Sequence, residues 1–68
     1  MNKEFILGIC GRVLGMHAAQ AKELILSSGL IYRLVSVDGL YYGGDTFNIP
    51  NRVNLEIIDG KVTSARPG

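Results

Sequence analysis

The stretch RVNLEIIDGKVTSA, residues 52–65, decides the fold. From Arg52 to Ile58 apolar and polar residues alternate, which predicts a strand with one buried face. Asp59-Gly60 follows directly, and this dipeptide is typical of a two-residue hairpin turn in which both positions have positive φ. Residues 61–65 therefore form the returning strand. The side chains expected to face the core are Val53, Leu55, Ile57 and Val62.

The segment before this hairpin, residues 38–51, has no helical period and is rich in turn-forming residues. Connections of this length are uncommon in small domains and are usually functional. The preceding residues 30–37 are apolar on both faces, as in a central strand. A hairpin needs only a few connecting residues, whereas a parallel pair needs a crossover of about a dozen. We therefore expect strands 30–37 and 52–58 to be parallel neighbours. Ile31, Val35 and Val37 are assigned to one face, and Tyr32 and Leu34 to the other.

A helix is predicted over residues 17–28, where small and apolar residues recur at three- and four-residue spacing. Gly29 is well placed to end this helix in a left-handed conformation. The core-facing stripe is Ala18, Ala21, Leu24, Ile25 and Ser28. The predicted fold class is thus α+β. A single helix packs on a small mixed sheet, whose parallel central strands are joined by a long exposed loop and which ends in a C-terminal hairpin.

The N-terminal residues 1–12 contain the apolar run Phe5–Cys10, which is too short for a membrane span or a signal-peptide core. We interpret residues 1–12 as an arm or an edge strand, which adds to the sheet or takes part in a homodimer contact. Residues 13–68 form the main domain. Cys10 is the single cysteine, so no intrachain disulfide is available. A small domain without disulfides is typical of a reducing compartment, and we expect a cytoplasmic protein.

The charge balance argues against nucleic acid as a partner. Seven basic and six acidic residues leave the chain nearly neutral. The sequence has no run of Lys or Arg that could neutralise a row of phosphates. The single histidine, His17, has no Cys, His or carboxylate at ligand spacing, so we expect no metal and no cofactor. The carboxylates are scattered among turns and one strand face, without the pairing that acid–base catalysis requires. We therefore expect a binding protein and not an enzyme.

The chain resembles the potato inhibitor I family of serine protease inhibitors, including its bacterial branch. The resemblance begins at Val13-Leu14-Gly15 and continues through the helix at residues 18–26. Its most specific part is NRVNLEI, residues 51–57, which is similar to the family's strand after the reactive loop. The final Pro67-Gly68 also matches the family's ending. The resemblance covers about residues 13–68.

This resemblance implies a loop that enters a protein partner as a substrate would, with a serine protease as the first candidate. The implied scissile bond is Thr46-Phe47, preceded by Asp45 where the family usually has Thr. The implied loop residues are Gly44, Asp45, Thr46, Phe47 and Asn48. The implied supports are Arg52 and Asn54, on the strand below the loop. A charge-assisted bond between Asp45 and Arg52 would be stronger than a hydroxyl bond.

Aromatic residues are concentrated in the same segment, and exposed aromatics mark recognition surfaces. Tyr41, Tyr42 and Phe47 are three of the five aromatics of the chain. Either they contact a partner, or Tyr42 or Phe47 folds down to cover the core. Two alternatives to an inhibitor stay open. One is a non-inhibitory binding module, for instance bacterial or phage-encoded, that uses the same scaffold against another macromolecule. The other is a homo-oligomer that holds a small ligand between loops of adjacent subunits.

Overall fold

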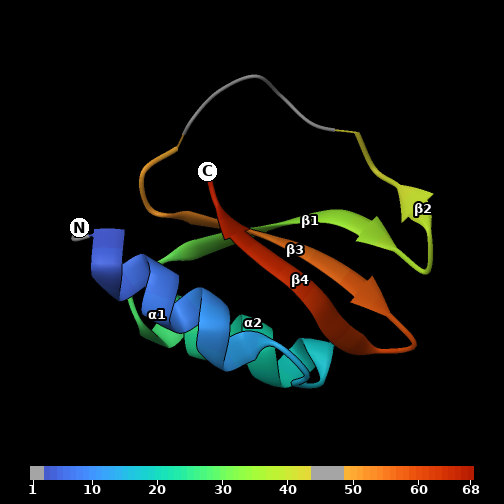
Figure 1. Cartoon of the computed structure of the whole chain (residues 1–68), viewed down its shortest axis with the longest axis horizontal. Coiled ribbons are helices and arrows are strands. Elements are labelled where there is room, and N and C mark those ends of the chain that lie inside the picture. The colour runs from blue at the N-terminus through green and yellow to red at the C-terminus, as the bar shows by residue number, and fades with distance from the viewer. Residues whose placement is uncertain (1–2, 44–48) are drawn as a thin grey trace.

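The computed structural model describes residues 3–43 and 49–68 (Figure 1). The elements in chain order are α1 (Lys3–Val13), α2 (Ala18–Ser27), β1 (Ile31–Val37), β2 (Leu40–Tyr41), β3 (Arg52–Ile58) and β4 (Lys61–Pro67). The strands form one four-stranded sheet in the order β2-β1-β3-β4. The central strands β1 and β3 are parallel, and the two outer pairs are antiparallel. The predicted α+β class with a mixed sheet and a parallel central pair is confirmed.

In the C-terminal hairpin, the side chains that face the core are those predicted from the alternation of apolar and polar residues. Val53 and Leu55 are fully buried, and Ile57 and Val62 are 3% and 2% exposed. At the turn, Asp59 and Gly60 have φ of 55° and 78°, which confirms the left-handed pair expected there. β4 extends to Pro67, so the returning strand is longer than the predicted 61–65.

The first strand differs from its prediction because it contains a bulge. The register against β3 shifts between Leu34 and Ser36, which leaves Val35 as an extra residue. Alternation is therefore interrupted, and Tyr32 and Leu34 pack against the core on the same side as Val37. The expected grouping of Ile31 and Val35 with Val37 is wrong: Ile31 is 43% exposed, and Val35, though buried, is not part of the main core cluster.

A second hairpin, absent from the sequence-based prediction, follows β1. Asp38 and Gly39 have φ of 52° and 80°, which repeats the turn conformation of the C-terminal hairpin. They connect β1 to the short strand β2, in which Leu40 pairs with Val37 and Tyr41 with Ser36. The long connection to β3 thus begins after Tyr41 and not at Asp38.

The predicted helix is present as α2, and its stripe faces the core. Ala21 and Ile25 are fully buried, while Leu24 and Ala18 pack partly buried against the core. Gly29 has φ of 82°, and Leu30 folds back so that its N–H donates to the Ile25 carbonyl at 3.1 Å. This is the left-handed helix ending that the sequence predicts.

The N-terminal segment is a helix, α1, and neither an arm nor an edge strand, so the expectation of a single helix is wrong. Four of its residues recur at i, i+3, i+4 and i+7 and are at most 5% exposed. They are Ile6, Ile9, Cys10 and Val13. α1 contacts mainly β4, and α2 contacts β1, so the helices cover one face of the sheet (Figure 1). In residues 3–43 and 49–68, no helix lies on the opposite face.

Ala21→Asp tests the position of α2 on the sheet. It would place an unpaired carboxylate in a fully buried site and should cost roughly 3–5 kcal/mol. Ala19→Asp is the matched control, because Ala19 is exposed and lies in the first turn, where a carboxylate is favourable. Urea denaturation measures both variants. Equal stabilities of the two variants would contradict the described packing.

Gly60→Ala and Gly8→Ala add the same atom in open space, since neither added Cβ meets another atom within 4 Å. At Gly60, with φ of 78°, alanine should cost about 1–2 kcal/mol because of its left-handed conformation. At Gly8, inside α1, alanine should stabilise by about 0.5–1 kcal/mol. Thermal denaturation of the pair should therefore give shifts of opposite sign. A destabilised Gly8→Ala would argue against α1 as a helix.

Candidate functional site

The candidate site is the sheet face opposite the helices, together with the connection from β2 to β3. Figure 1 shows both described ends of that connection on this side of the sheet. The described part comprises residues 42–43 and 49–51. The loop residues expected from the family resemblance, Gly44, Asp45, Thr46, Phe47 and Asn48, lie outside the described residues. The site is therefore built here from the supports beneath them.

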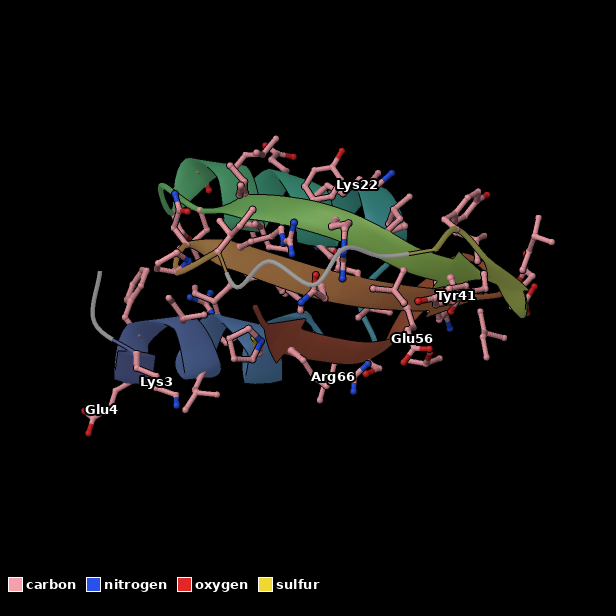
Figure 2. All side chains as sticks on the ribbon, turned by 90° about the horizontal axis from the view of Figure 1, so that it is seen from above. Lys3, Glu4, Lys22, Tyr41, Glu56 and Arg66 are labelled. Carbon is pink, nitrogen blue, oxygen red and sulfur yellow. The ribbon has the colours of Figure 1, made fainter. Side chains whose placement is uncertain are left out.

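Polar side chains cover this face of the sheet. In β3 the polar residues alternate with the buried apolar ones, so they point to the face away from the core. Arg33 Nε, from β1, donates to Asn54 Oδ1 at 3.0 Å. Ser36 Oγ donates to Glu56 Oε1 at 3.1 Å. Arg66 Nη2, from β4, lies 3.8 Å from Glu56 Oε2, and Figure 2 shows these two side chains near one another. Strands β1, β3 and β4 are thus joined by side-chain contacts as well as by their backbone.

Arg33 is a site residue that the sequence-based reasoning missed. It pairs in register with Asn54, the expected second support of the loop. Asn54 holds the guanidinium of Arg33 in place, which is a contact that the family resemblance does not predict. One sequence feature could have indicated it. An Arg in a central strand is unusual, and it requires a polar partner on the neighbouring strand.

Arg52 forms a clamp between the start of β3 and the end of β4. Its side chain is 5% exposed, and its Nε and Nη2 donate to the Gly68 carbonyl at 3.1 and 2.7 Å. Gly68 N–H in turn donates to the Arg52 carbonyl at 3.1 Å. Two donors from one planar guanidinium fix an orientation as well as a distance.

The same clamp reaches the returning end of the connection. Ile49 N–H donates to the Gly68 carbonyl at 3.4 Å, and Arg52 N–H donates to the Ile49 carbonyl at 3.2 Å. Ile49, Arg52 and Gly68 are therefore joined in one network. At the other end, Tyr42 N–H donates to the Val35 carbonyl at 2.9 Å. Both ends of the connection are thus fixed to the sheet.

The aromatic residues next to the connection point away from the core. Tyr41 is 66% exposed and Tyr42 is 59% exposed, with Leu40 beside them at 65%. The alternative that Tyr42 covers the core is wrong, and Phe47 lies outside the described residues. These three consecutive exposed residues are defined here as the β2 patch, and tyrosine is a residue type that is enriched at protein interfaces.

The remaining reactive groups lie away from this face. Cys10 is a buried free thiol on α1, and burial raises the pKa of that thiol. His17 makes no side-chain cap bond to α2. No group of three potential metal ligands occurs in residues 3–43 and 49–68. Among these residues, neither helix has the length and hydropathy needed to cross a bilayer.

Comparisons with protein-family models, with curated protein sequences and with solved structures find no match for this chain. Function therefore has to be inferred from the contacts around the connection between β2 and β3. Among these contacts, the Arg52 clamp involves the most buried charged group of the described residues.

Arg52→Ala should remove the clamp while the helix–sheet core remains. We expect a loss of roughly 1–3 kcal/mol, because the Gly68 carbonyl loses two charge-assisted bonds. Limited proteolysis should become faster between Tyr42 and Arg52, since one end of the connection is released. Arg66→Ala is the matched control, because that side chain is 67% exposed and should cost less than about 0.5 kcal/mol. Equal cleavage rates for the two variants would show that Arg52 does not hold the connection.

Proposed function

We propose that this protein binds a protein partner through the connection between β2 and β3, in the manner of a small serine protease inhibitor. The observation that carries the proposal is the Arg52 clamp. It fixes Ile49 and Gly68 to the start of β3, at the base of the connection. Arginine is rarely buried unless it is paired, and here the pairing holds the returning end of the connection.

Preorganisation is the physical reason for such a clamp. A loop that is already held near its bound shape loses little conformational entropy on binding, so more of its contact energy appears as affinity. The bond from Tyr42 to Val35 holds one end, and the clamp holds the other. Arg33 and Asn54 make the sheet face between these ends rigid and polar.

The resemblance to the potato inhibitor I family supports the choice of a protease as partner. The proposed contact residues are Gly44, Asp45, Thr46, Phe47 and Asn48. In this proposal Thr46 occupies the primary specificity pocket of the protease. Arg52 stands where the family has a support, and its contact with Gly68 supports this proposed role. The single, buried Cys10 supports a reducing, cytoplasmic location.

The β2 patch favours a second candidate function, a non-inhibitory binding module. Leu40, Tyr41 and Tyr42 lie outside the substrate-like segment and are each more than half exposed. Aromatic anchors of this kind dominate many protein–protein interfaces. In this second function the partner contacts the β2 patch, and the connection contributes the rest of the surface.

Thr46→Leu tests the inhibitor proposal. Subtilisin- and chymotrypsin-like enzymes prefer large apolar side chains in their specificity pocket, so this variant should inhibit them more strongly than the unchanged chain. The increase should be lost when Arg52→Ala is added, because the loop is then unsupported. Inhibition constants against a small panel of such proteases give the comparison.

The two candidate functions predict different results for the β2 patch. Replacing both Tyr41 and Tyr42 by Ser should leave protease inhibition unchanged if the substrate-like loop is the contact surface. Absence of inhibition by the unchanged chain and by Thr46→Leu, with the fold retained, would overturn the inhibitor proposal and leave the binding module.

A further inference from the structure

The two outer edges of the sheet differ in how far other segments of the chain cover them. The edge of β4 is covered at its start by the segment between the helices. Gly15 N–H donates to the Val62 carbonyl, and Val62 N–H donates to the Met16 carbonyl, both at 2.9 Å. Near its end, Gly68 N–H points inward to Arg52, so the preceding Pro67 faces outward and has no N–H to offer. This edge is closed to further pairing over much of its length.

The outer edge of β1 is open over its first half. β2 pairs only with Ser36 and Val37. Among the described residues, the bond from Tyr42 to Val35 is the last backbone contact on this edge before the connection begins. In the described part of the chain, no strand lies beside the outer edge of residues 31–34.

One hydrogen bond shows which backbone N–H and C=O groups of β1 point away from the sheet at this open edge. Ile31 N–H donates to the Asn51 carbonyl, toward β3. Since backbone groups alternate in direction along a strand, the N–H and C=O of Tyr32 and Leu34 point outward. These groups continue the line of β2 at the place where β2 ends. An extended segment of about four residues, antiparallel to β1, fits this line.

One cationic side chain lies beside the open edge. Lys22 Nζ, from α2, lies 5.6 Å from the centre of the Tyr32 ring, and Figure 2 shows Lys22 next to β1. Arg33, the charged residue of β1 itself, instead donates to Asn54 of β3. The next residue of α2, Glu23, instead lines a hollow that it shares with Arg12 of α1, away from β1. No acidic side chain belongs to residues 31–34.

We infer that the outer edge of β1 at residues 31–34 binds an extended segment of a partner protein as an added antiparallel strand. Backbone hydrogen bonds to Tyr32 and Leu34 supply the pairing, and Lys22 selects a segment that carries an acidic side chain. A second copy of this chain is a poor occupant of the same edge. Two β1 edges would each bring Lys22 to one seam, with like charges opposed. The inference is independent of the proposed loop function, which uses the sheet face.

The probe for this edge is the blocked peptide acetyl-Thr-Val-Glu-Val-Thr-Val-amide, titrated into the ¹⁵N-labelled protein. Chemical-shift changes should centre on residues 31–35, and amide hydrogen exchange should slow at Tyr32 and Leu34. The same peptide with Lys in place of Glu should bind at least several-fold more weakly at low salt. Two further peptides, one N-methylated at its odd positions and one at its even positions, test whether backbone hydrogen bonds to β1 contribute to binding. One of them should lose binding, because its methyl groups face β1, and the other should keep it.

Charge-swapped variants make the test specific. Lys22→Glu should weaken binding of the glutamate peptide and strengthen binding of the lysine peptide. Lys61→Glu is the matched control, because this exposed lysine begins β4, on the closed edge, and should change neither affinity. Both variants should melt as the unchanged protein does.

Four results would overturn the inference. They are absence of binding at millimolar peptide, shifts centred away from β1, equal binding of both N-methylated peptides, and a free protein that is already a dimer with Tyr32 and Leu34 amides protected. The last result would assign the edge to a second copy of the chain.

Discussion

The parallel pairing of β1 and β3 is the constraint on which the rest of the structure depends. Parallel neighbours cannot be joined by a tight turn, so the chain must return from the end of β1 to the start of β3. Both helices lie on one face of the sheet, and the described ends of the return, residues 42–43 and 49–51, lie on the other side (Figure 1). The long connection is a result of this topology, and its supports are the polar residues that alternate with the buried ones of β3.

Much of the fold could be predicted from the sequence because its local patterns are regular. The alternation of β3, the turn at Asp59-Gly60 and the stripe of α2 each need only neighbouring residues. α1 was missed because its buried residues are hidden in the continuous apolar run Phe5–Cys10, where alternate apolar positions also suit a strand. The faces of β1 were misassigned because the bulge at Val35 depends on the pairing with β3, which no local pattern records.

The site could be predicted only in part, for the same reason. The family resemblance implies Arg52 as a support, yet its contact with Gly68 is between residues 16 apart and appears only when β4 has folded back. Arg33 and Asn54 are 21 residues apart and meet only through the parallel pairing. The sequence can therefore indicate that Arg33 needs a polar partner, but it identifies that partner only when the neighbouring residue of β3 is known. Contacts between distant residues limit prediction here more than helix or strand propensities do.

The anchoring of the connection at both ends also has an evolutionary consequence. The buried core cluster takes no member from residues 38–43 and 49–52, so core packing does not restrict the sequence at these described positions. Length is weakly restricted too, because doubling a flexible loop adds only about 0.6 kcal/mol to the entropy cost of closing it. Insertions and substitutions between Tyr42 and Ile49 can then accumulate while Val35 and Arg52 keep the ends in place. The fold is a frame in which one segment is free to diversify at little cost to the stability of the whole.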